Sequence, residues 1–167
     1  MVELKVIPGG VTAPAGFLAA GVPAEIKKRH EGPGEPRKDM ALIYSPTPCA
    51  AAATFTTNLV KAAPILVTRE HLDSGLGIQA VVVNSGNANA CNGGQGLGDA
   101  RKMAQLTASA LGLDARQVAV ASTGVIGVPL PMDRIEAGIR ALPAKLSPAG
   151  GEDAARAIMT TDTIKKE

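Results

Sequence analysis

Between residues 78 and 121, a strand, a polar loop, a helix and a second strand follow one another, and this order most constrains the fold. β-Branched residues bounded by Gly77 and Asn84 predict the first strand, and apolar residues at helical spacing that stop before Gly112 predict the helix. The expected ranges are a strand over 78–83, a helix over 98–111 and a strand over 118–121. Alternation of this kind predicts a mixed α/β, layered fold.

The flanking sequence predicts further elements around this unit. We expect a short strand before residue 23, strands at 40–44, 50–55 and 64–68, a helical turn at 69–72, an exposed turn at 31–38, a loop at 143–151, and helices at 131–142 and 152–159. Asp99 is expected near the positive N-terminal end of its helix. At 167 residues, a single domain over 1–167 is the default.

Composition excludes several classes of function. Aromatic residues make up only 2% of the chain, so the core must consist of aliphatic side chains, and stacking platforms for nucleic acid are not expected. The net charge is +2, and the basic triplet 27–29 is best explained as a solvated turn. The sequence shows no secretory leader and no apolar run of about 18 residues, which predicts a cytoplasmic protein without membrane contact.

The stretch from Ala121 to Gly127 places a hydroxyl and a glycine where a strand opens into a turn. Glycine lets the backbone come close to a ligand with its N–H turned outward, and the Thr123 hydroxyl is a second donor beside Gly124. Two convergent donors are what an acyl-transfer enzyme needs to stabilise a tetrahedral oxyanion. Strand ends of this kind are common ligand sites in α/β sheets.

A second polar loop, residues 84–93, follows the other strand. Its asparagines either bond the backbone of their own loop or form the polar wall of a small-molecule pocket, and the residues alone leave both interpretations open. The glycines at 93–98 fit neither phosphate-binding spacing, GxGxxG or GxxxxGK[ST], so we expect them to permit a closely packed strand-to-helix turn.

No nucleophile with its base is evident. His30 and His71 are expected on the surface without a catalytic role, and Cys49 and Cys91 are expected to be reduced and buried. The spacing of these four residues fits no zinc site. Donors for an oxyanion without a nucleophile predict either a binding module or a site completed by another chain.

Taken together, five ordered motifs resemble one family. The motifs are GFLAAGV at 16–22, TFTTN at 54–58, VVNSGNANAC at 82–91, STGVIG at 122–127 with LPMD at 130–133, and AIMTTDT at 157–163. They resemble the N-terminal, or α, part of the ornithine acetyltransferases, the glutamate N-acetyltransferases of arginine biosynthesis.

The resemblance implies a fold shared with the D-aminopeptidase DmpA, completed by a separate β chain cut from the same precursor. The first residue of that β chain is a threonine nucleophile, whose α-amino group is thought to act as base. It takes acetyl from N-acetylornithine and passes it to glutamate, and some members also accept acetyl-CoA. The resemblance implies an α₂β₂ or larger assembly and no cofactor or metal.

Residue by residue, the resemblance assigns oxyanion stabilisation to Thr123, through its hydroxyl, and to Gly124, through its backbone N–H. It assigns substrate contact to Thr160, in a segment that the residues alone would also allow to be a simple C-terminal turn. Asn92 departs from the threonine that many members have there. The Lys-Gly pair and the nucleophile of the family would lie beyond Glu167.

Two other functions remain as alternatives. One is half of a related amidohydrolase or aminopeptidase with an N-terminal threonine, in which water is the acceptor. The other is a non-enzymatic domain that binds a small molecule and is stable without a partner.

Overall fold

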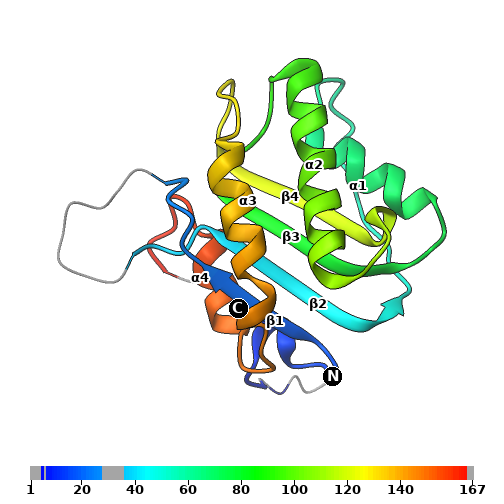
Figure 1. Ribbon diagram of the computed structural model, residues 1–167, viewed down its shortest axis with the longest axis vertical. Coiled ribbons are helices and arrows are strands. Elements are labelled where there is room, and N and C mark those ends of the chain that lie inside the picture. The colour runs from blue at the N-terminus through cyan, green and yellow to red at the C-terminus, as the bar shows by residue number, and fades with distance from the viewer. Residues whose placement is uncertain (1–4, 6, 28–35, 165–167) are drawn as a thin grey trace.

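The computed structural model describes residues 5, 7–27 and 36–164. Its centre is a four-stranded sheet in the order β1-β2-β3-β4 (Figure 1). The strands are β1 (Leu18–Val22), β2 (Met40–Cys49), β3 (Ile78–Asn87) and β4 (Val118–Val125). β1 is antiparallel to β2 and β2 is antiparallel to β3, whereas β4 is parallel to β3, so the carboxyl ends of β3 and β4 lie at the same end of the sheet. The predicted turn at 31–38 lies largely outside the described residues, and His30, Lys28 and Arg29 lie wholly outside them.

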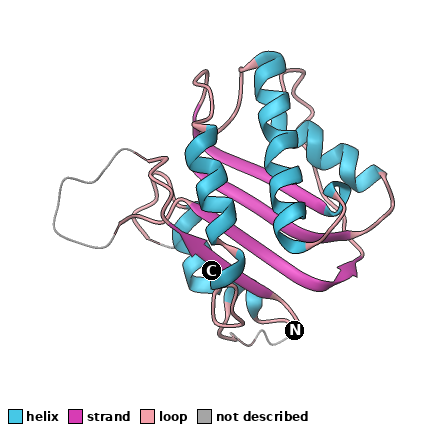
Figure 2. Cartoon of the chain, viewed as in Figure 1, coloured by secondary structure: helices cyan, strands magenta, loops and turns pink. Residues whose placement is uncertain are grey.

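Helices cover the two faces of the sheet unequally (Figure 2). Three helices pack on one face: α1 (Ala63–Asp73), α2 (Gly93–Leu111) and α3 (Met132–Ala141). The other face carries α4 (Gly151–Ile158), which packs mainly against β1 and β2. Short 3₁₀ turns stand at Gly10–Thr12, Ala115–Gln117 and Pro143–Lys145. None of the described helices combines the length and apolar character needed to cross a bilayer.

The two faces have cores of different size. The larger core lies between the sheet and the three helices and is built from side chains such as Met40, Leu42, Val82, Met103 and Ile135. Under α4 the buried core residues are all alanines, namely Ala19, Ala41, Ala154 and Ala157. Small side chains allow α4 to approach the sheet closely. The prediction of an aliphatic core is confirmed, with methionine added.

The predicted α/β architecture is confirmed, and so are the strands at 40–44, 78–83 and 118–121 and the helices that begin near 131 and 152. The strand predicted at 64–68 is wrong, because these residues form the first half of α1, with a proline in its first turn. Proline fits the start of a helix, where its missing N–H would have no partner. No strand forms at 50–55 either.

The central helix begins earlier than predicted, at Gly93 instead of residue 98. Asp99 therefore lies in the second turn, beyond the first-turn position expected for it. Burial raises the pKa of the Asp99 carboxyl, and one of its oxygens, Oδ2, is buried without a hydrogen-bond partner among the described residues. The charged form of Asp99 is thus disfavoured in the folded protein.

We expect Asp99→Asn to stabilise the protein at neutral pH. A carboxyl whose pKa is raised on folding loses stability as pH rises past its unfolded pKa, and this penalty is complete above the folded pKa. The neutral amide carries no such penalty, so the gain should be present at pH 7 and vanish below about pH 3.5. Thermal unfolding across this range would measure it; a gain that is constant with pH would contradict the assignment to charge. The exposed Asp73, changed to Asn, is the matched control.

Candidate active site

The candidate site lies where β3 and β4 end, at the left-hand edge of the sheet in Figure 1. Thr123 pairs with Ser85 across the two parallel strands, and Gly124 pairs with Gly86. Ser85 is fully buried, and its hydroxyl donates to the carbonyl of Ala157 in the last turn of α4. Because paired residues of neighbouring strands point to the same face, Thr123 lies on the face that α4 partly covers.

The two residues assigned to an oxyanion have the properties that this role requires. Thr123 is half-buried, and its hydroxyl has no hydrogen-bond partner within the described part of the chain. Gly124 is exposed and has φ of 135°, a conformation that L side chains rarely adopt. A Cβ on Gly124 would lie 2.3 Å from the carbonyl carbon of Gly86, so only glycine fits here. The site therefore offers an unused hydroxyl beside an accessible backbone.

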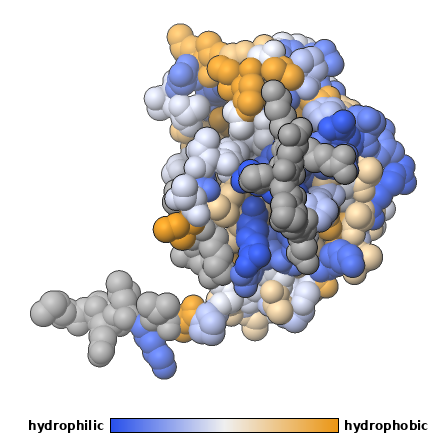
Figure 3. Space-filling view, turned by 90° about the vertical axis from the view of Figure 1, so that its left-hand side faces the viewer, coloured by the Kyte–Doolittle hydropathy of each residue, from blue (hydrophilic) through white to orange (hydrophobic). Residues whose placement is uncertain are grey.

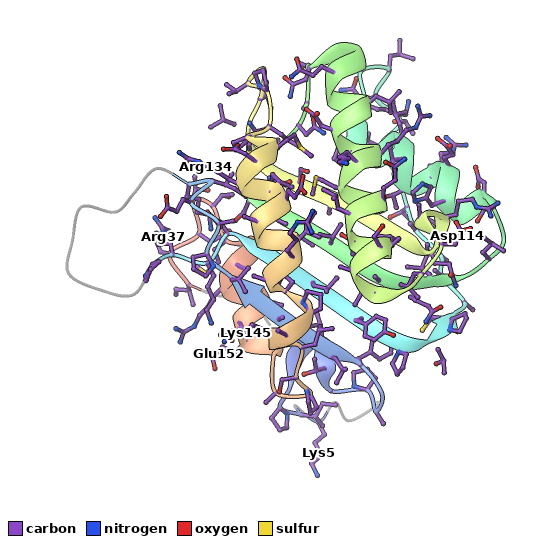
Figure 4. The ribbon with its side chains drawn as sticks, viewed as in Figure 1. Lys5, Arg37, Asp114, Arg134, Lys145 and Glu152 are labelled. Atoms are coloured by element: carbon purple, nitrogen blue, oxygen red, sulfur yellow. The ribbon has the colours of Figure 1, made fainter. Side chains whose placement is uncertain are left out.

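Thr160 follows the end of α4 and is half-buried. The Ser85 hydrogen bond to Ala157 fixes the helix end three residues before it. The preceding residue, Met159, lines an open hollow of about 230 Å³ with the side chains of Pro36, Arg37, Lys38 and Arg156. Figure 4 shows Arg37 at the same side of the molecule as the strand ends. The fold thus brings the segment of Thr160 to the face that carries Thr123.

The asparagines of residues 84–93 donate to backbone carbonyls, as the structural interpretation of this segment expected, but the amides of Asn87 and Asn92 bond backbone carbonyls of the loop after β4 and not those of their own loop. Asn87 is buried, and its amide donates to the carbonyls of Val128 (2.9 Å) and Pro129 (3.1 Å). Asn92 donates to the same Val128 carbonyl at 2.9 Å. Two backbone hydrogen bonds join the same two segments: the Ala88 N–H donates to the Val125 carbonyl, and the Gly127 N–H donates to the Ala90 carbonyl. We call this set of side-chain and backbone bonds the clamp. These amides therefore fix the loop that leaves β4.

Asn89 anchors the start of α2 in the same way. It is fully buried in the left-handed conformation, with φ of 48°, and donates to the Gly96 carbonyl at 2.8 Å. A Cβ on Gly96 would lie 2.6 Å from Asn89 Oδ1. The expectation that this glycine-rich stretch permits close packing is confirmed at Gly96.

A buried carboxylate that the sequence analysis missed supports the same edge. Asp39 is 1% exposed and accepts hydrogen bonds from the backbone N–H groups of Ala24 (2.6 Å), Ile26 (2.7 Å) and Lys27 (3.1 Å). Burial, and then the nearby charge of Arg37, lower the pKa of Lys27. The only sequence signal was an acidic residue directly before a strand, which usually indicates a solvated strand end.

The expectations for histidine and cysteine need correction. His71 is buried, and its Nδ1 lies 2.7 Å from the Val118 carbonyl, a hydrogen bond that links α1 to β4. Both cysteines are free, as expected, but neither is buried: Cys49 is half-buried and Cys91 is exposed. Among the residues that the structure describes, no three His, Cys, Asp or Glu side chains gather closely enough to hold a metal ion.

Apolar side chains lie beside the candidate site. Figure 3 looks onto this edge and shows apolar surface gathered at its upper end. Val125 at the end of β4 and Ile126 and Val128 in the loop that follows are about half exposed or more. The end of β4 that carries Thr123 is therefore followed directly by exposed apolar side chains.

Comparison with known proteins gives the family. The ArgJ family matches residues 18–167. The chain belongs to this family. It is 62% identical, over 161 residues, to an arginine biosynthesis bifunctional protein ArgJ of Symbiobacterium thermophilum, and 54% identical over 151 residues to one of Geobacter sulfurreducens. These alignments cover 96% and 90% of this chain but only 39% and 37% of the relatives, so the chain spans about two fifths of their length.

Solved ArgJ-family structures share the fold. A crystal structure of the ArgJ protein from Bacillus halodurans matches with a TM-score of 0.85 at 42% identity, covering 93% of this chain and 78% of that one. An ornithine acetyltransferase from Mycobacterium tuberculosis, solved in complex with ornithine, matches with the same TM-score at 45% identity, covering 93% and 81%. The predicted family and its layered α/β fold are thereby confirmed.

We expect Asn87→Asp to loosen the loop that leaves β4. The carboxylate keeps the size of the amide but loses both donated hydrogen bonds, which leaves two carbonyls without this partner and should cost about 1–3 kcal/mol. Hydrogen exchange should accelerate at the Ala88 and Gly127 amides. Asn58→Asp, on an exposed turn, is the control. Unchanged exchange in the Asn87 variant would show that the clamp does not depend on this side chain.

Proposed function

We propose that this chain is the α part of a glutamate N-acetyltransferase of arginine biosynthesis. It moves acetyl from N-acetylornithine to glutamate through an acetyl-threonine carried by a companion β chain. The companion corresponds to the part of the ArgJ relatives that this chain does not match. The chain has no transferase activity without it, and the two assemble as α₂β₂ or larger.

One observation carries this proposal: the Thr123 hydroxyl, which has no hydrogen-bond partner among the described residues, lies next to Gly124, an exposed position at which only glycine fits. Both lie at the end of β4, and Thr123 is on the face of the sheet to which the end of α4, three residues before Thr160, is bonded. A fixed pair of donors can accept the charge of a tetrahedral oxyanion without reorganisation. Thr123 and Gly124 would serve as this pair, and Thr160 would contact the substrate.

The chemistry follows in two balanced steps. The hydroxyl of the β-chain threonine attacks the acetyl carbonyl of N-acetylornithine, a C–O bond forms, the C–N bond breaks, and ornithine leaves as the amine with the proton. The glutamate amine then attacks the acetyl-threonine ester: a C–N bond forms, the ester C–O bond breaks, and the proton lost by the amine regenerates the threonine hydroxyl. Each step passes through an oxyanion, which the Thr123 hydroxyl and the Gly124 N–H would stabilise.

Acetyl-CoA would be a second donor for the same threonine. The curated relatives are named bifunctional proteins, which suits an enzyme that accepts two acetyl donors. The hydrolase alternative differs only in the acceptor, water in place of glutamate, and no observation favours it.

Co-expression with the β chain tests the activity. The assembly should form N-acetylglutamate from N-acetylornithine and glutamate, and the isolated chain should not. Omission of glutamate distinguishes the alternatives, since a hydrolase would release acetate at the same rate without it. Replacement of N-acetylornithine by acetyl-CoA tests the second donor.

We expect Thr123→Ala in the assembly to lower kcat by about a hundredfold or more, because one donor to the oxyanion is lost. Thr123→Ser keeps a hydroxyl and should retain most of the activity. Thr161→Ala, an exposed neighbour of Thr160, is the control. Steady-state kinetics of the three variants measure the effect. An unchanged kcat for Thr123→Ala would remove Thr123 from the oxyanion site.

A further inference from the structure

We propose that Ser122 and Asn84 form a positioning pair that aims the oxyanion donors from the opposite face of the sheet. This inference rests on the proposed function, since it concerns how Thr123 and Gly124 are held. Neither residue of the pair would touch substrate.

The pair is joined by a short hydrogen bond. Ser122 donates through Oγ to Oδ1 of Asn84 at 2.6 Å, and the Asn84 amide donates to the Asn87 carbonyl at 2.8 Å. Asn84 is fully buried, with no exposed surface. Ser122 is half-buried, so the acceptor end of this hydrogen bond is shielded from water, and a bond at such low local dielectric is stronger than one in water.

The pair lies on the face of the sheet that α1, α2 and α3 cover, opposite to the face that carries α4. Asn84 continues the row of Ala80 and Val82 along β3, and Ser122 continues the row of Val118 and Val120 along β4, all of which belong to the larger core. Thr123 is the next residue and points to the α4 face, because successive side chains of a strand alternate. Ser122 can therefore act on the reaction only through the backbone that it shares with Thr123.

The pair lies on β3 and β4 at the point where it can influence the backbone of Thr123 and Gly124. The β3–β4 ladder is regular up to Ser85–Thr123 and Gly86–Gly124 and then loses its register at Asn87. Beyond this point regular ladder pairing no longer fixes where β4 lies. The Ser122–Asn84 bond ties the two strands one residue before the proposed donors, and through Asn87 it reaches the irregular part. It thus sets the direction in which Thr123 and Gly124 project.

Variants of Ser122 in the α–β assembly test this. Ser122→Ala removes the donor, and we expect kcat to fall about tenfold while the KM for N-acetylornithine stays within about twofold, because displaced donors weaken the transition state more than substrate binding. Ser122→Thr keeps a hydroxyl and should restore kcat. Ser109→Ala, an exposed serine on α2, is the matched control. Should Ser122→Ala fail to assemble, Ser122→Cys, a weaker donor, gives a graded version.

The double variant Ser122→Ala/Thr123→Ala separates positioning from general damage. If Ser122 acts by aiming the Thr123 hydroxyl together with the Gly124 N–H, part of its effect is lost once Thr123 is alanine, so the double variant should be clearly less than about tenfold slower than Thr123→Ala; a full further tenfold loss would show that the two residues act independently and would overturn the proposal. A normal kcat for Ser122→Ala beside a strongly reduced one for Thr123→Ala would also overturn it while leaving the proposed function intact. A normal kcat for Thr123→Ala would instead refute the oxyanion assignment itself.

Discussion

The structure depends above all on the buried asparagine amides in the last part of β3 and just after it. A strand that ends inside a protein leaves backbone carbonyls and N–H groups that cannot reach water, and each needs a partner. Asn84, Asn87 and Asn89 supply these partners for three different segments: the end of β3, the loop after β4 and the start of α2. These hydrogen bonds therefore fix the path of the chain after β4 and the position at which α2 begins.

The two faces of the parallel pair have separate tasks. On the face that α1, α2 and α3 cover, aliphatic side chains and the Ser122–Asn84 hydrogen bond hold the two strands in register. On the other face, a thin alanine layer carries α4, whose last turn is fixed to Ser85. This division leaves Thr123 half-buried beside a fixed helix end, which is the geometry on which the proposed acetyl transfer relies.

Much of the fold could be predicted, because periodicity reports which face of an element is buried. The β-branched run of β3 was consistent only with a strand, and the amphipathic pattern of α3 only with a helix. The residues at 64–68 were ambiguous, because Pro, Ile, Leu and Val suit a buried strand as well as a buried helix. They form a helix that packs against β4, where the Thr68 hydroxyl donates to the Val120 carbonyl at 2.8 Å. His71 was misjudged for the same reason, since its burial follows from that helix.

The sequence by itself determined the α/β alternation, the aliphatic core, the polar strand ends and the family to which the chain belongs. Each of these follows from the order of neighbouring residues or from residues at a fixed spacing along the chain. Only the tertiary structure decided that the asparagines hold backbone, that Gly124 must lack a side chain, and that Ser85 joins β3 to α4. These facts depend on contacts between segments up to 72 residues apart, for which no local pattern exists.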